Sequence, residues 1–372
     1  MIPYGHQSIN ENDIHAVAEV LRGDWLTIGP LVEEFENEIS KIVGAPCISV
    51  SSGTAALHCA FASIGLEQGD EIITPPITFI ATQATAALMG AKIVFADVLP
   101  DTANINPRAV EAVITPRTKA IVAVDFAGHP ADLDELRAIA DKHGIYLIED
   151  AAHSIGASYN GKQIGSIADI TTFSFFPTKN LTTGEGGAVS SIHPDLLDKA
   201  RRFSRQGLVR ENALLKYSNE GPWHQEVHNF GLNYRLPDVL CALGISQIKR
   251  LPEFKAARSS IFDNYTNQLK DIESVLTPAR RTYVDPVWHL YPIRVEQRMR
   301  KKIFEELRNF GIGVQVNYMP VYWHPVFETL GFKRGLCPEA EKFYSSEISL
   351  PMFVDLTQKQ QDKVIDCLLN LI

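Results

Sequence analysis

Short apolar runs alternate with helical stretches along the chain from about residue 46. Runs rich in Val, Ile, Phe and Thr predict β-strands at residues 47–52, 71–75, 92–97, 119–125, 145–150, 170–176 and 187–191. Helices are predicted near residues 54–64, 79–89, 107–114, 132–143 and 194–206. This alternation is typical of an α/β fold with a mainly parallel central sheet, in which ligands bind beyond the carboxyl ends of the strands.

Helices are also predicted on either side of this region. Asn10 can cap a first helix that Gly23 ends. A long helical stretch begins after Leu236, and we expect Pro252 to kink or break it. The apolar face expected for the first helix consists of Ile14, Val17, Val20 and Leu21.

The last third of the chain has more widely spaced elements. Strands are predicted at residues 289–295 and 313–318, and helices near residues 299–310, 338–347 and 356–371. We therefore predict a large domain over residues 1–250 and a smaller α+β domain over residues 251–372.

Composition narrows the class of protein. Hydrophobic residues make up 45% of the chain and charged residues 21%, which is the balance of an ordered globular protein. The formal net charge of −9, without a long run of one sign, argues against a nucleic-acid partner. A few local arginines or lysines could still bind an anionic small substrate.

Cysteine spacing and hydropathy indicate the compartment. The five cysteines lie far apart and show no metal-ligand spacing, so we expect neither a metal site nor a disulfide framework. No stretch reaches the roughly 20 apolar residues of a membrane span, and the N-terminal residues show no apolar signal core. We expect a cytoplasmic protein with no membrane partner.

Polar residues follow the first predicted strand of the sheet. Residues 51–54 read Ser-Ser-Gly-Thr and open a helix, so hydroxyls, a glycine and free N–H groups gather there as in a phosphate cradle. The same residues also suit a simple helix cap and a tight turn, and this motif alone does not decide between the two.

Two later strand ends carry ionisable groups. Asp150 ends an apolar strand, where it could face a protonated pyridine nitrogen or merely cap the next turn. Lys179 follows another strand in a turn rich in Thr and Gly, where it could form an imine or be an ordinary surface charge. Phe79 could stack on a cofactor ring or belong to the core. Together the three strand ends supply what a pyridoxal-phosphate (PLP) enzyme needs: a phosphate cradle, a carboxylate and a lysine.

Taken in order, these motifs resemble the DegT-type family of nucleotide-sugar aminotransferases, which have the fold-type-I architecture of PLP-dependent transferases. The resemblance runs from about Tyr4 to Leu369. The segments that carry it are residues 26–30, 51–57, 78–79, 149–154, 174–179, 184–187 and 231–236.

The resemblance implies a role for each matching residue. Lys179 would hold the cofactor aldehyde as a Schiff base, Asp150 would bind the ring nitrogen, and His153 would contact the region of the phenolic oxygen. Lys179 and Asp150 are thus the expected catalytic residues. The other cofactor-binding residues implied within the subunit are Gly53, Thr54, Phe79 and Ser174.

The family also implies a homodimer with shared active sites. Its Gly-x-Asn-x-Arg-Leu segment reaches the neighbouring subunit, so Asn233 and Arg235 would complete the phosphate pocket there. Some members act as dehydratases and have histidine in place of the lysine. Because Lys179 is present, that branch is disfavoured.

The last third resembles the branch of the family that acts in the pseudaminic-acid pathway. This implies transfer of an amino group from L-glutamate to C4 of a UDP-linked 4-keto-6-deoxy sugar. The segments at residues 288–293, 315–322 and 347–351 carry the resemblance, although Asn317 stands where that branch often has histidine. The residues that would frame the sugar are Tyr4, His6, Trp25, Asn317, Tyr318 and His324.

Other functions remain open at this point. One is a related aminotransferase acting on another UDP- or dTDP-linked 4-keto sugar. A second is a regulator that binds PLP without turnover, and a third is a PLP-dependent sugar dehydratase. Intact Lys179 and Asp150 favour a transaminase over these last two.

Overall fold

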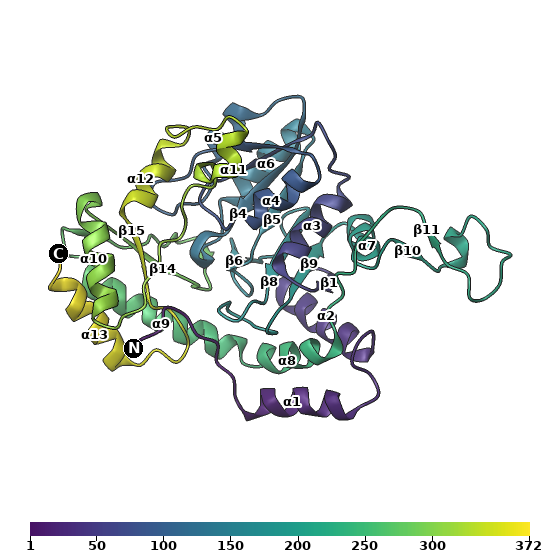
Figure 1. Cartoon of the computed structure of the whole chain (residues 1–372), viewed down its shortest axis with the longest axis horizontal. Coiled ribbons are helices and arrows are strands. Elements are labelled where there is room, and N and C mark those ends of the chain that lie inside the picture. The colour runs from purple at the N-terminus through teal and green to yellow at the C-terminus, as the bar shows by residue number, and fades with distance from the viewer.

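A seven-stranded sheet forms the centre of the protein (Figure 1). The structure is a computed structural model that describes residues 1–372. The strands lie in the order β1, β9, β8, β5, β4, β2, β3, and only β9 runs antiparallel to its neighbours. Their bounds are β1 Cys47–Val50, β2 Glu71–Thr74, β3 Lys92–Phe95, β4 Thr118–Val124, β5 Tyr146–Asp150, β8 Ile170–Ser174 and β9 Gly187–Ser191. The predicted mainly parallel α/β sheet is confirmed.

Helices cover this sheet, and two buried clusters fill the space between them. Strand alternation separates the clusters: Ile121 and Val122 are neighbours on β4 but belong to opposite ones. The helices between the strands are α3 Gly53–Ser63, α4 Ala81–Leu88, α5 Pro107–Val113, α6 Leu133–His143 and α7 Pro194–Phe203, with a 3₁₀ turn, η1, at Phe126–Gly128. A small antiparallel sheet joins β6 Ser158–Tyr159 to β7 Lys162–Gln163 and to β13 Val284–Asp285.

The first helix, α1 Glu11–Arg22, has the predicted caps at Asn10 and Gly23. The prediction for its apolar face is wrong in part. Only Val20 is buried, whereas Ile14 is 53% exposed and Leu21 is 61% exposed. The helix is anchored instead through buried Asp13, whose carboxylate accepts hydrogen bonds from Ser246 and Gln247 on helix α8, Asp238–Ile248.

A break divides the helical stretch after Leu236, as predicted. Helix α8 spans Asp238–Ile248 and α9 spans Leu251–Leu269. Pro252 lies in the first turn of α9, where its missing N–H leaves no helical bond unmade. The N-terminal helix α2, Pro30–Val43, packs beside α8.

A three-stranded sheet of β12 Val275–Leu276, β14 Tyr291–Val295 and β15 Glu347–Leu350 organises the last third. The helices there are α10 Gln297–Asn309, α11 Pro325–Thr329, α12 Pro338–Ser346 and α13 Gln358–Leu369, with a 3₁₀ turn, η3, at Val321–Trp323. A third buried cluster beneath this sheet includes Ile2 from the other end of the chain. Residues 321–343 contribute instead to a cluster of the central sheet. The division into residues 1–250 and 251–372 stays a prediction.

The predicted strand at residues 313–318 does not form. Its backbone N–H groups bond to three different partners: Gly313 to the carbonyl of Ile2, Gln315 to that of Ser349, and Asn317 to the side chain of Glu347. A strand needs one continuous ladder, and only the isolated bridge between Gln315 and Ser349 is left. Residues 347–350, for which no strand was predicted, pair with β14 instead.

A hairpin arm, defined as residues 207–230, projects from the body of the protein (Figure 1). It contains β10 Leu208–Val209, the turn η2 Asn212–Leu214, and β11 Glu226–Val227. Gly207 begins the arm with a φ of 75°, and a Cβ there would come within 1.8 Å of the Asn229 carbonyl oxygen, so only glycine fits. Three large aromatic residues of the arm, Tyr217, Trp223 and Phe230, are exposed.

No helix of the protein combines the length and the apolar character that a membrane span requires.

The anchor of α1 gives a first testable prediction. Asp13→Ala leaves the buried polar groups of Ser246 and Gln247, together with the Arg250 guanidinium, without their shared acceptor. We expect a loss of about 2–3 kcal/mol in the docking of α1 on α8. Hydrogen exchange of the α1 amides should accelerate accordingly, while the exposed control Asp24→Ala leaves their exchange unchanged. Equal protection in both variants would show that Asp13 does not hold the helix.

Candidate active site

A cavity of about 430 Å³ opens where β1, β5 and β8 end. Its walls include the first turn of α3, the segments that follow β5 and β8, and residues from both ends of the chain. The residues predicted for the site that line it are Tyr4, Gly53, Thr54, Phe79, Asp150, His153, Ser174, Lys179, Asn317 and Tyr318. The carboxyl ends of the strands thus bring together groups that lie up to 314 positions apart.

Lys179 reaches the cavity from the turn after β8. The backbone N–H of Lys179 donates to the carbonyl of Phe176 at 2.9 Å, which fixes this turn. Burial of the amine lowers the pKa of Lys179 to about 8, although the negative charge of Asp150 opposes the shift. A substantial fraction of the amine is therefore neutral near neutral pH, as a nucleophile towards an aldehyde must be.

Asp150 is buried at the end of β5, and its two carboxylate oxygens have separate donors. The hydroxyl of Thr82 donates to one at 2.7 Å, and the backbone N–H of Ala152 donates to the other at 3.2 Å. Burial raises the pKa of Asp150, while these two donors and the charge of Lys179 hold the rise back. The side chain is thus fixed in orientation and faces the cavity as an acceptor.

Thr82 was not predicted as a site residue. It lies in the first turn of α4, three residues after Phe79, and the sequence gives no sign that it meets a carboxylate 68 positions away. Its contact with Asp150 is made only because β2 and β5 lie on either side of β4 in the sheet.

Two histidines with rings tilted against each other line the cavity. The rings of His153 and His289 have centroids 4.3 Å apart, and neither Nδ1 has a partner. Burial lowers the pKa of both histidines well below the usual value, and the charge of Lys179 adds to the effect. Both rings are therefore neutral. His289 was not predicted, although it lies in the 288–293 segment that carries the family resemblance.

The first turn of α3 forms one corner of the cavity, where its backbone N–H groups could bind a phosphate. Its leading N–H groups have no intrahelical partner, and the side chain of Ser52 accepts from the N–H of Ala55 at 3.1 Å. A Cβ at Gly53 would come within 2.8 Å of the Cβ of Ser174, so glycine keeps this corner open. An anion placed here would meet the positive end of the helix.

Phe79 and Tyr318 stand at the mouth of the cavity. Phe79 is 61% exposed, and its ring meets the ring of Tyr318 edge to face with centroids 6.4 Å apart. On the same side the amide of Asn317 donates to the hydroxyl of Tyr4 and, at 3.2 Å, to that of Ser349. These polar groups come from the first and last parts of the chain.

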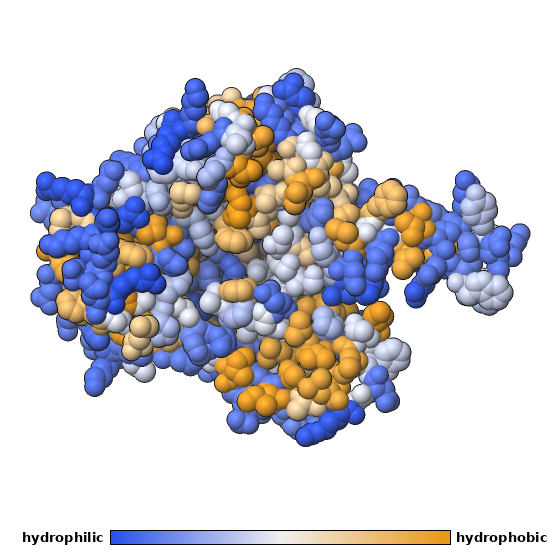
Figure 2. All heavy atoms as spheres, viewed as in Figure 1, coloured by the Kyte–Doolittle hydropathy of each residue, from blue (hydrophilic) through white to orange (hydrophobic).

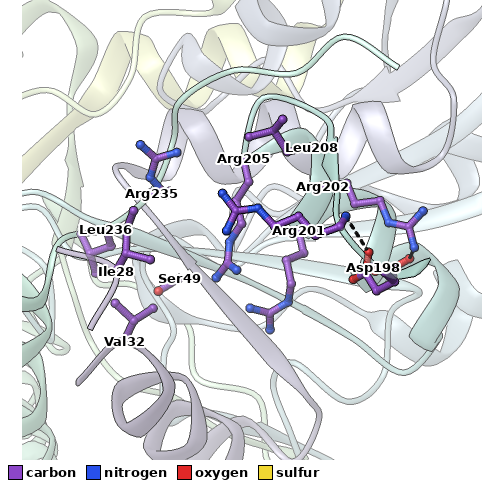
Figure 3. A pocket seen from close by; sticks show the side chains of 12 residues that line it. Ile28, Val32, Ser49, Asp198, Arg201, Arg202, Arg205, Leu208, Arg235 and Leu236 are labelled. Carbon is purple, nitrogen blue, oxygen red and sulfur yellow. Dashed lines mark hydrogen bonds and ion pairs between the residues drawn. The ribbon is translucent and has the colours of Figure 1, made fainter. Parts of the chain in front are cut away.

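Five predicted residues lie outside this cavity in the protomer. His6 packs on Phe353 with ring centroids 6.4 Å apart, and His324 precedes α11. Trp25 lines a separate groove beside α1 and α8. Asn233 is exposed, and Arg235 lines a pocket rich in arginine (Figure 3).

The residues present in the cavity suit PLP. The buried amine of Lys179 can bind an aldehyde, the carboxylate of Asp150 can pair with a protonated ring nitrogen, and the α3 corner can hold a phosphate. The Nδ1 atoms of His153 and His289, which line the cavity, have no hydrogen-bond partner, so each could bond to a polar group of the cofactor. A lysine and a carboxylate presented with a phosphate corner at the strand ends define a PLP-dependent enzyme of fold type I.

The comparisons with known proteins agree. Residues 7–369 match the DegT/DnrJ/EryC1/StrS aminotransferase family, and the chain belongs to this family. It is 37% identical over 378 residues to the spore coat polysaccharide biosynthesis protein SpsC of Bacillus subtilis, covering 100% of this chain and 97% of SpsC. It is 35% identical over 380 residues to the UDP-4-amino-4,6-dideoxy-N-acetyl-β-L-altrosamine transaminase of Campylobacter jejuni, covering 100% and 98%.

Solved structures extend the similarity to the whole fold. The PLP form of the putative sugar aminotransferase Spr1654 from Streptococcus pneumoniae superposes with a TM-score of 0.93 at 29% identity, covering 100% of this chain and 98% of that one. Helicobacter pylori PseC, an aminotransferase in the biosynthesis of pseudaminic acid, gives 0.92 at 31% identity, covering 100% and 98%. The predicted fold-type-I architecture and the PLP cofactor are confirmed, and the protein is an aminotransferase.

The lowered pKa of Lys179 predicts how the cofactor-free protein takes up PLP. Only the neutral amine attacks the aldehyde, so uptake should accelerate with pH and level off above about pH 9. With a pKa of about 8, the neutral fraction rises roughly tenfold between pH 7 and pH 9, whereas an unperturbed lysine would give a rise of about a hundredfold without levelling. Stopped-flow absorbance in the visible measures this rate. A profile that still climbs tenfold per pH unit at pH 9 would contradict the assignment.

Proposed function

We propose that this protein transfers an amino group from L-glutamate to C4 of a nucleotide-linked 4-keto-6-deoxy sugar. The product proposed is UDP-4-amino-4,6-dideoxy-N-acetyl-β-L-altrosamine, as the name of the Campylobacter jejuni relatives indicates. The observation that carries the proposal is that one cavity is lined both by Lys179 and Asp150 at the ends of the sheet strands and by the hydrogen-bonded pair of Tyr4 and Asn317.

Each residue has a distinct task in the proposed reaction. When bound, PLP supplies an electron sink for the negative charge that develops on the donor carbon. Asp150 keeps the ring nitrogen protonated. The Nζ of Lys179 would act as the general base and acid: it would take the proton from the α-carbon of glutamate in the first half of the reaction and deliver a proton to C4 of the sugar in the second half. Tyr4, Asn317 and Tyr318 orient the sugar.

A related aminotransferase is the second candidate. Asn317 stands where the pseudaminic-acid branch often has histidine, and this residue lies in the wall of the cavity. SpsC, a protein of spore coat polysaccharide synthesis, is as similar to this chain as the altrosamine transaminases are. Both observations make other UDP- and dTDP-linked 4-keto sugars candidate substrates as well. A PLP-binding regulator would not require the desolvated amine of Lys179, and a sugar dehydratase of this family would have histidine in its place.

Two exposed apolar surfaces support a homodimer. Figure 2 shows apolar side chains gathered over α1 and the segment that follows it, where the exposed residues are Ile14, Leu21, Trp25, Leu26 and Ile28. The hairpin arm carries a second set, with Trp223 80% exposed and Phe230 95% exposed. Such surfaces are characteristic of contacts between subunits. The proposed dimer shares its active sites, with Asn233 and Arg235 serving the second subunit.

The cytoplasm is the proposed location, and five unpaired cysteines support it.

Incubation with glutamate and a panel of UDP- and dTDP-linked 4-keto sugars tests the activity. Mass spectrometry should detect replacement of the keto oxygen by an amine, most rapidly with the UDP-linked altrosamine precursor. Lys179→Ala should lower turnover by at least a thousandfold, because proton transfer by a positioned side chain contributes factors of about 10²–10⁴ and the covalent attachment is lost as well. The control Lys142→Ala, an exposed lysine paired with Glu111, should remain active. Water loss without amine transfer would identify a dehydratase instead.

Mixing two inactive variants tests the shared sites. Lys179→Ala and the double variant Asn233→Ala/Arg235→Ala should each be inactive alone. In a mixed dimer with shared sites, one site has both defects and the other has neither. Activity should therefore partly return once subunits exchange, which tagged subunits can verify. Verified exchange without recovered activity would show that Asn233 and Arg235 serve their own subunit or only its stability.

A further inference from the structure

A chain of hydrogen bonds runs from a buried carboxyl group to the wall of the active-site cavity. Its inner members, Glu347 and Ser349, are fully buried on β15 and are not among the residues that line the cavity. Its outer members, Asn317 and Tyr4, do line the cavity. The chain therefore connects a titratable group outside the cavity to two polar groups that are proposed to meet the sugar.

The alternation of β15 places the inner members side by side. Residues two apart on a strand point to the same face, and this face of β15 meets the segment at residues 313–318. The backbone N–H of Asn317 donates to one carboxylate oxygen of Glu347 at 2.8 Å, and the hydroxyl of Ser349 donates to the other. Both oxygens of the buried carboxylate are thus used as acceptors.

The hydroxyl of Ser349 determines how the next group is oriented. Its single hydrogen is donated to Glu347, so its oxygen can only accept from the carboxamide of Asn317. The amide must therefore turn its NH2 group towards Ser349, where Nδ2 and Oγ are 3.2 Å apart. The two ends of an asparagine amide have nearly the same shape, so the hydrogen-bond partners decide which end faces which way.

The same NH2 group also donates to the hydroxyl oxygen of Tyr4. Both amide hydrogens of Asn317 are then used, while its carbonyl oxygen and the hydroxyl hydrogen of Tyr4 are left for a ligand. The wall thus presents one hydrogen-bond acceptor and one donor. If the amide were inverted, the wall would present the NH2 group instead, and Tyr4 would donate its hydrogen to the amide oxygen.

We propose that Glu347 is a positioning residue for sugar recognition. By orienting the hydroxyl of Ser349, and through it the amide of Asn317, Glu347 sets which polar groups of the wall donate and which accept. A sugar substituent that has both an N–H and a carbonyl group, such as the acetamido group of the proposed substrate, matches this wall. Because the ligand is taken to be a nucleotide-linked N-acetyl sugar, the role of Glu347 rests on the proposed function.

One proton on Glu347 would reverse the direction of the chain. Burial raises the pKa of Glu347 to about 8, while the hydrogen bonds from Ser349 and Asn317 and the charge of Arg300 on α10 oppose the rise. A protonated Glu347 would donate to Ser349, whose hydrogen would then point to Asn317. The arrangement in the structure is therefore that of the ionised carboxylate.

The other ionisable groups around Glu347 do not change charge in the same pH range. Arg294 lies opposite Glu347 on β14, and its guanidinium donates to the carbonyl of Pro100 at 2.6 Å. Burial raises the pKa of both Tyr4 and Tyr318, so their hydroxyls stay neutral. The proton that matters for the chain is thus the one on Glu347.

Glu347→Gln tests the role of this carboxylate with little change of shape. The amide oxygen of the glutamine must accept the N–H of Asn317, so its NH2 group donates to Ser349 and reverses the chain at every pH. At pH 9, calorimetric titration of the PLP form with the UDP-linked 4-keto sugar, without glutamate, should show an affinity lowered by about tenfold or more. The control Glu296→Gln replaces an exposed carboxylate and should bind like the wild type. Unchanged affinity in Glu347→Gln would overturn the proposal.

The pH dependence of the same titration separates this role from a purely structural one. With a pKa of about 8, the ionised fraction of Glu347 rises roughly tenfold between pH 7 and pH 9. The wild-type affinity for the sugar, divided by that of Glu347→Gln, should rise with it. The limiting rate of the half-reaction with glutamate and the temperature of unfolding should be the same in both proteins, because Lys179 and Asp150 keep their contacts. A ratio that falls or stays constant over this range would contradict the proposal.

A double-mutant cycle tests whether Glu347 acts through Ser349. Ser349→Ala interrupts the chain between Glu347 and the amide of Asn317. The double variant Glu347→Gln/Ser349→Ala should therefore lose no more sugar affinity than Ser349→Ala alone. Additive losses would show that Glu347 acts by another route, which would overturn the proposed chain.

Neutron diffraction of the ligand-free protein in D2O at pH 9 gives a result that needs no sugar. In the wild type, the deuterium atoms of the Asn317 amide should lie on the atom that faces Ser349 and Tyr4. In Glu347→Gln they should lie on the opposite atom. The same orientation in both proteins would overturn the role of Glu347 even if the sugar is aminated. Absence of amination with every sugar of the panel would instead reject the proposed function.

Discussion

The burial of an amine and a carboxylate around one cavity is the constraint on which this structure depends. Asp150 ends β5 and Lys179 lies in the turn after β8, and neither charge would be tolerated there without the other groups of the cavity. The hydroxyl of Thr82 and the N–H of Ala152 hold back the rise in the pKa of Asp150, and burial lowers the pKa of Lys179 so that its amine is partly neutral. Placing β8 next to β5 in the sheet is what brings the two groups to one edge.

The central sheet could be predicted from the sequence because its strands are short, fully apolar runs and the segments between them have the periodicity of helices. The prediction for α1 was wrong in part because apolar residues on one face of a helix do not have to pack against the core of their own chain. Ile14 and Leu21 face outwards, and a buried carboxylate, Asp13, holds the helix in place. Residues 313–318 alternate like a strand, but their N–H groups bond to a carbonyl near the N-terminus and to a carbonyl and a side chain of β15. The local sequence pattern does not show these distant partners.

For the site, sequence reasoning was strongest at strand ends. Asp150, Lys179 and the Ser-Ser-Gly-Thr turn all follow apolar runs, so their meeting at one edge follows from the topology. Thr82 and His289 could not be found this way, since each matters only through a contact with a distant residue. Asn233 and Arg235 lie outside the cavity, and their part in a site shared between two subunits belongs to the proposed dimer.

The contact between Tyr4 and Asn317 has a consequence for the order of events during synthesis. The two residues are 313 positions apart, and the neighbouring strand-like bridge joins Ile2 to Ile312. At a rate of about 5–20 residues per second, the N-terminus waits roughly 15 to 60 seconds on the ribosome before its partner has been made. The sheet and its lysine can fold in that interval, but the part of the cavity wall that contains Tyr4 and Asn317 cannot. The wall that Tyr4 and Asn317 form, which we propose orients the sugar, is therefore among the last parts of the cavity that a newly made chain completes.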